Sequence, residues 1–267
     1  MLVSLPMYDF PELTAATAAW WAGLRRHFQA QGVAGLPDAV TPGVDPIGQW
    51  DGPPLIFSQT CGYPMTHALA GKVRLLATPR YSAPGCAGAT YVSWIVVRRD
   101  DPAAGFADLR GRRPAFNGRD SQSGYNVLRG LAAPLAVDGR FFGPGIESGA
   151  HRKSLAMVAA GQADLAAIDC VSFALIARVA PREVAGLRVL RASAAAPSLP
   201  YVTTASTDAA TVGRLQAGIL AACADPALAD ARRALLIEGC EILPPACYDV
   251  ILEMERRAVA RGYPELD

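Results

Sequence analysis

At 267 residues, the chain is longer than one typical domain, and two lobes of about 100 to 150 residues each are the natural expectation. Hydrophobic residues make up 51% and charged residues 18% of the sequence, which is typical of a globular protein and excludes a disordered chain. The 25 basic and 24 acidic side chains are interspersed, for a net charge of +1, which argues against nucleic acid as a partner. No apolar run approaches the length of a membrane span.

Short β-like runs alternate with helical patterns, as in an α/β fold with largely parallel sheets. The first helix is the clearest, because Trp20, Leu24 and Phe28 recur at helical spacing between Pro11 and Gly32. In chain order, the first part is predicted as strand 2–7, helix 11–32, strand 53–60, a short helix near 65–71, and strands at 72–81, 90–102 and 113–117.

The second part continues the alternation and ends in helices. It is predicted as helix 124–135, a turn-rich stretch at 139–150, helix 151–161, strand 163–169, helix 171–180, strand 186–193, a connection at 194–200, strand 201–206 and three helical stretches from 207 to the end. No flexible linker marks a domain boundary. The strand around 90–97 and the stretch 200–204 are instead the expected crossings between two lobes.

The N-terminus "MLVSLPMYDFPEL" lacks the basic and apolar regions of a signal peptide, so no export signal is expected from it. The six cysteines show no C-x-x-C and no His at metal-ligand spacing, which argues against a zinc site. Turn-like sequence makes Cys61 with Cys86, and Cys240 with Cys247, the candidate disulfide pairs; buried free cysteines are the alternative. Disulfides would indicate an oxidising compartment.

The segment "NGRDSQSGYNVLRG" combines Ser121, Ser123 and Gly124 at a predicted helix start. A strand precedes it, so free N–H groups and the positive end of a helix dipole lie at the carboxyl end of a strand, where α/β proteins bind ligands. Two hydroxyls add donors there, and the glycine permits close approach of a ligand to the backbone. Anion binding and simple helix capping are the two interpretations.

A second segment, "IESGAHRKSLAMVAAG", repeats this arrangement, with His151 opening the next helix. Asp169 ends the strand that follows, where a carboxylate would repel a fully ionised ligand and favour a protonated oxyanion such as hydrogen phosphite or a phosphonate monoanion. Capping of the following helix is the alternative for Asp169. Tyr8 and Thr60 follow two other predicted strands and are candidates for an opposite wall.

Catalytic templates are missing from the sequence. There is no G-x-S-x-G elbow, no Walker loop and no G-x-G-x-x-G after a strand. A Ser-His-Asp triad would depend on His67 or His151 and on a geometry that sequence does not show. We expect no catalytic residue, no cofactor and no metal.

In their order, these pieces resemble the phosphate/phosphite/phosphonate-type solute-binding proteins of ABC transporters, which have the class II periplasmic binding-protein fold. The resemblance lies in the aromatic residue of "MYDFPE" and in "SQSGY", which is similar to the family's S-x-S-G-Y signature. It continues in "SGAHRKSLAMVAAGQADLAAID", which is similar to the family's G-x-H…S-x-x-x-V-x-x-G-x-A-D-x-A-x-x-D run.

The resemblance implies two lobes, each a mostly parallel sheet flanked by helices, with a ligand cleft between them. Lobe 1 would comprise residues 1–92 and 201–267, and lobe 2 residues 93–200. The cleft residues implied for lobe 2 are Ser121, Gln122, Ser123, Gly124, Tyr125, His151 and Asp169; those for lobe 1 are Tyr8 and Thr60. Binding would close the lobes, because the closed state holds the ligand more tightly.

The resulting expectation is a monomeric, non-enzymatic protein that binds a small oxyanion (phosphonate-, phosphite- or phosphate-like) and passes it to an ABC permease with its ATPase. The resemblance implies a periplasmic location, whereas the missing signal peptide leaves the cytoplasm open. The alternative is a cytoplasmic enzyme or ligand sensor on the same scaffold, acting on a small carboxylate or phosphorylated metabolite, with Asp169, His151 or Cys61 as acid or base.

Overall fold

The computed structural model describes residues 2–41 and 55–266; Pro53 and Pro54 of the predicted second strand lie outside them. The chain divides into two compact units. Unit 1 comprises residues 1–82, 87–90 and 197–247, and unit 2 comprises residues 83–86, 91–196 and 248–267. Both units contain a sheet with flanking helices, so the predicted α/β class is confirmed.

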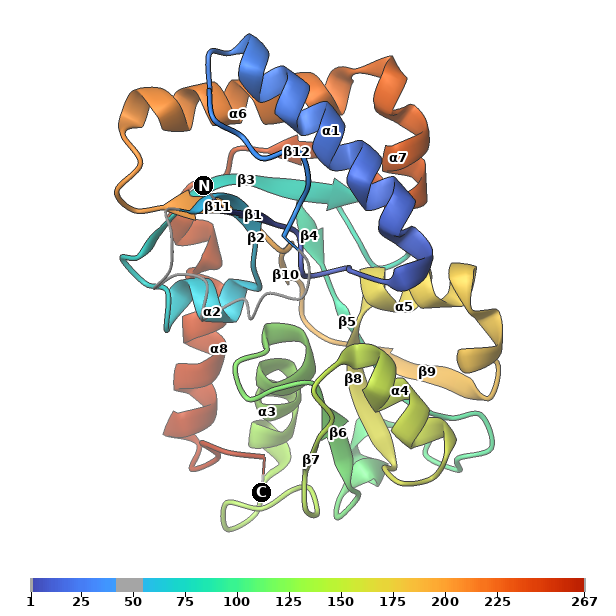
Figure 1. Ribbon diagram of the computed structural model, residues 1–267. Helices are drawn as coiled ribbons and strands as arrows, with labels where there is room; N and C mark the ends of the chain where they lie inside the picture. Colours follow the sequence, from blue (N-terminus) through green and yellow to red (C-terminus); the bar gives the residue numbers. More distant parts are fainter. Residues whose placement is uncertain (1, 42–54, 267) are drawn as a thin grey trace. The chain divides into compact units, whose positions relative to one another are not determined.

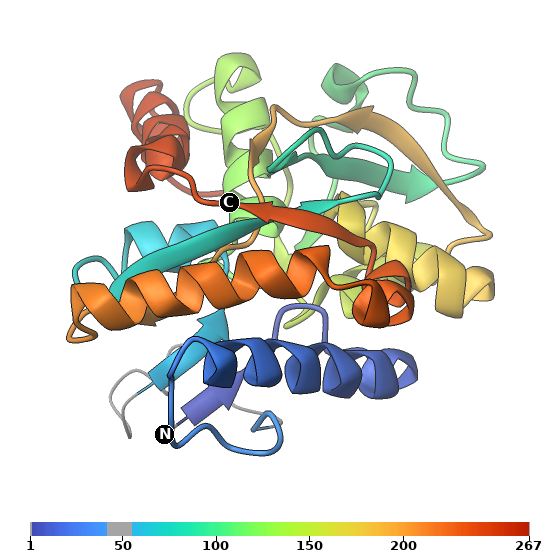
Figure 2. The same cartoon turned by 90° about the horizontal axis from the view of Figure 1, so that it is seen from above.

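Unit 1 contains a five-stranded sheet in the order β1 (Leu2–Ser4), β2 (Leu55–Gln59), β11 (Tyr201–Thr204), β3 (Val73–Tyr81) and β12 (Ile237–Glu241). Its helices are α1 (Thr14–Ala30), α2 (Gly62–Thr66), α6 (Ala209–Ala224) and α7 (Ala229–Ala234), with single turns η1 (Pro11–Leu13) and η7 (Pro226–Leu228). Helices α1 and α6 pack side by side (Figures 1 and 2).

The packing of α1 explains its apolar stripe. Trp20, Leu24 and Phe28 are all buried, and the ring centroids of Phe28 and Phe57 of β2 lie 5.4 Å apart, edge to face. Gly218 of α6 allows the two helices to approach closely, because a Cβ atom there would lie 2.5 Å from Phe28. The helical periodicity in the sequence therefore corresponds to a buried helix face.

Unit 2 contains a second five-stranded sheet in the order β7 (Ile146–Glu147), β6 (Pro114–Phe116), β8 (Leu165–Asp169), β5 (Ser93–Arg98) and β9 (Leu187–Ala192). Its helical elements are η3 (Phe106–Leu109), η4 (Gln122–Asn126), α3 (Val127–Ala132), η5 (Ala133–Leu135), α4 (His151–Ala159), α5 (Cys170–Val179), η6 (Pro181–Glu183) and α8 (Asp249–Ala260). Helix α8 packs along α3 (Figure 1). The turn η8 (Pro245–Tyr248) and the paired strands β4 (Thr90–Tyr91) and β10 (Ala196–Pro197) lie at the unit boundaries.

The prediction of mostly parallel sheets is wrong. In unit 1 only β1 and β2 pair in parallel, whereas β11 is antiparallel to both β2 and β3, and β12 is antiparallel to β3. In unit 2, β6 pairs in parallel with β7 and β8, but β5 is antiparallel to both of its neighbours. The chain passes from unit 1 into unit 2 just before β5, and from unit 2 back into unit 1 just before β11. Each of these two strands lies between two neighbours and runs antiparallel to both.

Two features of the C-terminal third also differ from the prediction. The three helical stretches are α6, α7 and α8, but a strand, β12, separates α7 from α8. In addition, residues 248–267 belong to unit 2 rather than to the unit that contains the N-terminus. The reason is packing: Ala258, Tyr263 and Leu266 are buried in the apolar core of unit 2.

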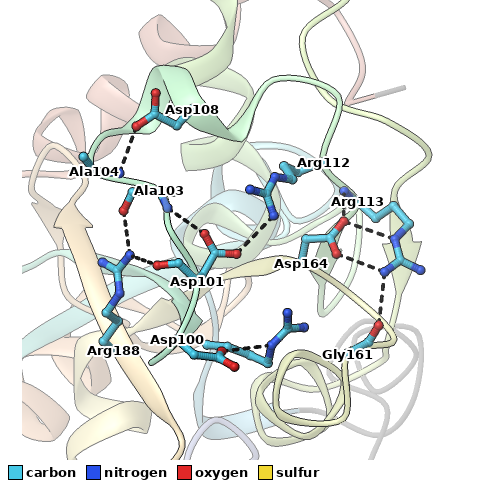
Figure 3. A network of polar contacts seen from close by, with 11 residues as sticks. Asp100, Asp101, Ala103, Ala104, Asp108, Arg112, Arg113, Gly161, Asp164 and Arg188 are labelled. Atoms are coloured by element: carbon cyan, nitrogen blue, oxygen red, sulfur yellow. Dashed lines mark hydrogen bonds and ion pairs between the residues drawn. The ribbon is translucent and has the colours of Figure 1, made fainter.

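One edge of the unit 2 sheet, where β5 ends and β6 and β8 begin, is held by ion pairs (Figure 3). The buried Asp101 carboxylate accepts a hydrogen bond from Arg112 at 3.1 Å, and Arg188 donates to the Asp101 carbonyl at 2.8 Å. Arg113 forms a two-nitrogen pair with Asp164, at 3.1 and 2.9 Å, and this pair lowers the pKa of Asp164. The charged side chains at this end of the sheet therefore hold together the turns that connect its strands.

No helix within residues 2–41 and 55–266 combines the length and the apolar character needed to cross a membrane.

Candidate functional site

The opposite edge of the unit 2 sheet collects the polar residues that the sequence singled out. Asn117 follows the carboxyl end of β6, Asp169 ends β8, and Ser93 begins the antiparallel strand β5. Ser93 is the register partner of Asp169. The helical turn η4 contacts both β6 and β8, so the Ser-x-Ser-Gly segment lies at this same edge.

Ser121 caps the helix that begins at this edge. Its backbone is extended, its Oγ accepts a hydrogen bond from Gly124 N at 3.0 Å, and its carbonyl accepts from Tyr125 N and Asn126 N at 3.2 and 2.9 Å. The last of these closes a π-helical turn, which widens the first turn of the helix. The capping interpretation therefore holds for Ser121, whose O–H can still donate, and a direct ligand contact stays a prediction for it.

Ser123 and His151 form the central contact of the site. Ser123 Oγ lies 2.8 Å from His151 Nε2, although the two residues are 28 positions apart in the chain. Burial lowers the pKa of His151 to about 4, opposed in part by the Ala167 carbonyl, and no charged group acts on it. No hydrogen bond of regular geometry reaches the buried Nδ1 from the described residues. At neutral pH the site therefore presents a neutral imidazole and a hydroxyl.

Asp169 also caps a helix, as the alternative interpretation predicted. Its Oδ1 accepts hydrogen bonds from Val171 N at 2.6 Å and Ser172 N at 3.2 Å, at the start of α5. The carboxylate is almost fully buried. Amides at the N-terminus of α5 are thus satisfied within the chain, and the candidate anion donors are those of the Ser123 region.

Gly124 has a different neighbour from the one that the sequence suggested. A Cβ atom there would lie 1.9 Å from Asn117 Oδ1 and 3.2 Å from Asn117 N. The space next to Gly124 is therefore filled by the chain itself, and the glycine permits close approach of Asn117 rather than of a ligand.

Gln122 and Tyr125 point away from the Ser123–His151 contact. The Gln122 amide accepts from Asn126 at 2.6 Å and faces Met254 of α8. The buried Tyr125 ring packs edge to face on Phe116, and its hydroxyl donates to Glu265 at 2.9 Å. Burial and Glu265 raise the pKa of Tyr125 to about 12. These contacts give both residues a structural role, and a direct ligand contact stays a prediction for them.

Sequence reasoning missed two residues at this edge, Ser93 and Asn117. Ser93 is 1% exposed, yet its Oγ has no hydrogen-bond partner among the described residues, and the same holds for Asn117 Oδ1. Buried polar atoms in proteins are normally partnered. The available signal was a serine at the start of an otherwise apolar strand, "YVSWIVV".

In unit 1, the two predicted residues are embedded in the core. Tyr8 packs edge to face against Tyr81 with ring centroids 5.5 Å apart, and it lines a cavity of about 30 Å³ with Gln59 and Tyr201. That volume is about the space of one water. Thr60 is fully buried and its N–H donates to the Pro200 carbonyl at 3.1 Å.

A larger cavity of about 600 Å³ lies elsewhere in unit 2, where Val127 and Leu131 face Met254 of α8. None of the predicted site residues lines it. Across residues 2–41 and 55–266, no group of three or more His, Cys, Asp and Glu side chains could hold a metal ion.

The thiols pair differently from the sequence-based candidates, and none of the six cysteines forms a disulfide in the structure. Cys86 Sγ lies 3.5 Å from Cys170 Sγ. Cys240 shares a hydrogen bond with Cys223 of α6, so its thiol partner is not Cys247. Spacing along the chain suggested neighbours in sequence, whereas the fold brings distant cysteines together.

Comparison with solved structures identifies the fold. A binding protein component of an ABC phosphonate transporter from Pseudomonas aeruginosa superposes with a TM-score of 0.75 at 17% identity, over 98% of this chain and 88% of that one. PhnD1 from Prochlorococcus marinus, solved in complex with methylphosphonate, gives a TM-score of 0.74 at 13% identity, over 96% and 97%. XAC2383 from Xanthomonas citri, bound to ATP, gives 0.70 at 18% identity, over 97% of each chain.

These likenesses establish the periplasmic binding-protein fold that the sequence predicted. No curated protein matches the chain significantly. A family model described as "ABC transporter, phosphonate, periplasmic substrate-binding protein" matches residues 55–243. The match includes η4, α4 and β8, which carry the Ser-x-Ser-Gly segment, His151 and Asp169. The chain therefore belongs to the family of phosphonate-type periplasmic substrate-binding proteins of ABC transporters.

Proposed function

We propose that this protein binds a small phosphorus oxyanion, of the phosphonate, phosphite or phosphate type, at the Ser123–His151 contact of unit 2. The family is a solute-binding one that works with an ABC transporter, and the identity of the solute is our proposal. The observation that carries it is the polar edge of the sheet: Ser123 bonded to His151, next to strands that begin or end in Ser93, Asn117 and Asp169.

Buried polar atoms without hydrogen-bond partners support the binding of a polar ligand at this edge. Ser93 Oγ and Asn117 Oδ1 are buried without hydrogen-bond partners among the described residues. Such atoms cost stability unless something binds them. An oxyanion with several oxygens and a hydroxyl offers both acceptors and a donor.

The neutral state of His151 determines how Ser123 would act. The Ala167 carbonyl can only accept, so it favours the proton on the ring nitrogen that does not face Ser123; Nε2 then accepts from the Ser123 hydroxyl, and Ser123 Oγ can still accept from a protonated ligand oxygen. No charged group contributes to the lowered pKa of His151, so the pair that meets the ligand is neutral. Such a site favours a monoanion over a dianion.

Asp169 would strengthen the preference for a monoanion over a dianion. A carboxylate has several acceptor sites, and a protonated ligand oxygen would donate to Asp169, which also caps α5. A fully ionised ligand such as sulfate has no such proton and would be repelled. We therefore propose phosphonate or hydrogen phosphite monoanions as the preferred class.

Tyr8 and Thr60 remain our proposed contributors from unit 1. Closure of two lobes around the ligand would bring them into contact with it, and the ligand would bind the closed state more tightly. The loaded protein, as a monomer, would then pass its ligand to the permease and ATPase of an ABC importer.

Thermal shift and calorimetry with methylphosphonate, phosphite, phosphate and sulfate test the proposal. A ligand at a hundred times its dissociation constant adds about 2.7 kcal/mol of stability, or about 5 to 10 °C in Tm for a chain of this size. We expect that shift for methylphosphonate or phosphite and none for sulfate. Recovery of the bound compound unchanged, by phosphorus NMR, is expected for a binding protein and not for an enzyme.

Two variants locate the binding site. Ser123→Ala and His151→Ala should each abolish the shift, whereas Ser206→Ala, which removes an exposed hydroxyl of unit 1, should retain it. A flat response to all four anions, or full binding by Ser123→Ala, would count decisively against the proposal.

A further inference from the structure

Two cysteine thiols of unit 2 lie in direct contact, although the residues are far apart in the sequence. Cys86 Sγ and Cys170 Sγ are 3.5 Å apart, although the two residues are 84 positions apart in the chain. Cys170 is fully buried at the first position of α5, and Cys86 is partly exposed in the segment between β3 and β4. No step of the proposed ligand binding uses either thiol.

The backbone holds both cysteines in place. Cys170 N donates to the Val92 carbonyl at 3.1 Å, and Cys86 N donates to the Ala83 carbonyl at 3.0 Å. Gly85 has a φ of +96°, and a Cβ atom there would lie 2.6 Å from Trp94. The loop that presents Cys86 is therefore a fixed turn packed on β5 rather than a free segment.

The sulfurs are also chemically isolated from other partners. Contact with Cys86 and burial raise the pKa of the Cys170 thiol, with a further contribution from the neighbouring Asp169 carboxylate. A buried thiol of this kind reacts poorly with reagents from solvent. Its accessible reaction partner is the sulfur that touches it.

We propose that Cys86 and Cys170 form a disulfide bond in the mature protein. The family is periplasmic, and the periplasm is an oxidising compartment in which protein disulfides persist. A disulfide needs the sulfurs at about 2 Å, so the closure requires the two sulfurs to approach by about 1.5 Å from their separation of 3.5 Å.

The oxidant is a disulfide of a thiol–disulfide exchange protein or of oxidised glutathione. The partly exposed Cys86, as thiolate, attacks one sulfur of the oxidant and releases the other as a thiolate, which leaves a mixed disulfide. Cys170 then loses its proton and attacks Cys86 Sγ, which releases the second thiolate. Two electrons pass to the oxidant and two protons to solvent, and one S–S bond replaces two S–H bonds.

The bond would fix the start of α5 to the segment where the chain passes between the units. Residues 83–86 belong to unit 2, while residues 82 and 87 on either side belong to unit 1. Cys170 directly follows Asp169, which caps α5. The disulfide would thus hold the Asp169 cap and the entry of the chain into unit 2 in one covalent loop, independently of which ligand binds.

Peptide mapping of the full chain tests the proposal. The purified protein is incubated with oxidised glutathione under native conditions, free thiols are alkylated after unfolding, and the protein is digested without reductant. We expect a linked peptide that contains Cys86 and Cys170, lighter than its reduced parts by two hydrogen atoms. Alkylation of both cysteines, or a link from Cys86 to Cys61, would overturn the proposal; the map resolves Cys223 and Cys240 separately.

Variants add a readout in stability. Reduction should lower the Tm of the oxidised protein by about 5 to 10 °C, because the closed loop is long. Cys86→Ser and Cys170→Ser should each remove this dependence on reductant, and Cys61→Ser, the matched control, should retain it. Equal reductant sensitivity in Cys86→Ser and the parent protein would contradict the assignment. Since ligand binding is measured separately, failure here would leave the proposed anion site unaffected.

Discussion

Asn117 fills the space beside Gly124 and leaves no room for a side chain there. Because a Cβ atom would lie 1.9 Å from Asn117 Oδ1, we expect Gly124→Ala to displace Asn117 from the carboxyl end of β6. Such overpacking costs about 1 to 3 kcal/mol. Urea denaturation should therefore show a lower free energy of unfolding, and the anion response should weaken, because Asn117 lies at the same edge as Ser123.

A second substitution and a matched glycine separate sterics from backbone effects. Asn117→Ala combined with Gly124→Ala should regain part of the lost stability, because the clash with Oδ1 is gone. Gly213→Ala, in α6 with nothing within 4 Å, should instead stabilise by about 0.5 to 1 kcal/mol. A stable Gly124→Ala variant would refute the close contact with Asn117.

His151 should make stability depend on pH below neutrality. Its pKa is lowered from 6.5 to about 4 by burial, so between these values the unfolded chain binds more protons than the folded one. Stability is therefore lost as pH falls from 6.5 to 4, by up to about 3 kcal/mol. Urea denaturation of the parent protein and of His151→Gln at pH 7 and pH 4 measures this.

The difference in stability loss between the parent protein and His151→Gln separates the effect of the imidazole from that of the carboxylates, which titrate in the same pH range. We expect His151→Gln to lose less stability than the parent protein over that interval. Identical pH profiles would mean that the pKa of the folded imidazole is ordinary. Burial would then not keep the Ser123–His151 pair neutral below pH 6.5, which would contradict the lowered pKa of His151.

Parts of the site were predictable because short-range rules act on adjacent residues. Serine before a helix and aspartate at a strand–helix junction are local capping patterns, and Ser121 and Asp169 follow them. The Ser123–His151 contact and the buried Ser93 hydroxyl, which has no partner among the described residues, depend on which strands become neighbours, and neither spacing nor composition contains that information. The same limit applies to the contact of Cys86 with Cys170.

At the scale of elements, helix α8 is attached to unit 2 through a buried cation. The Arg129 guanidinium of α3 pairs with Glu255 of α8 at 2.9 Å and donates to Asn126 Oδ1 at 2.6 Å and to the Pro264 carbonyl at 3.0 Å. Its side chain is only 5% exposed. Polar contacts of one side chain therefore connect α3, α8 and the chain end.

Arg129→Met should lower the free energy of unfolding by about 2 to 4 kcal/mol, because it removes a buried guanidinium from a partly buried carboxylate and from two hydrogen-bond acceptors. Chemical denaturation measures the loss. Arg257→Met removes an exposed pair with Glu253 on the same helix, and it should change stability by less than about 0.5 kcal/mol. Similar losses in the two variants would contradict the role assigned to Arg129.

Element types followed from periodicity, but the order and direction of the strands did not. The pattern of α1 alone predicts a helix with one buried face. Strand β12, "IEGCE", is absent from the prediction of three helical stretches after residue 207, and its two glutamates and its glycine are all poor strand formers. At Gly239 a Cβ atom would lie 2.8 Å from the end of the Arg80 side chain, which is a contact between residues distant in the sequence.

At the scale of the whole molecule, unit 2 is assembled from three separate pieces of chain. The last piece, residues 248–267, contributes Tyr263 and Leu266, both without exposed surface, to the apolar core that contains Phe116 and Tyr125. The N–H of Leu266 also donates to the Tyr125 hydroxyl at 3.4 Å. The core of unit 2 therefore depends on residues synthesised after all of unit 1.

Deletion of residues 262–267 should accordingly affect unit 2 selectively. Loss of one buried Tyr and one buried Leu removes about 3 to 6 kcal/mol of stabilisation. Hydrogen–deuterium exchange should then be faster in peptides from β6, η4 and α3, and unchanged in peptides from β3 and α6 of unit 1, because local stability follows local packing. Arg261→Ala, an exposed change next to the deletion, serves as the control with parental exchange throughout. Uniformly faster exchange in both units would show that they unfold as one cooperative body, and undiminished protection of α3 would show that the C-terminal residues are dispensable for the core of unit 2.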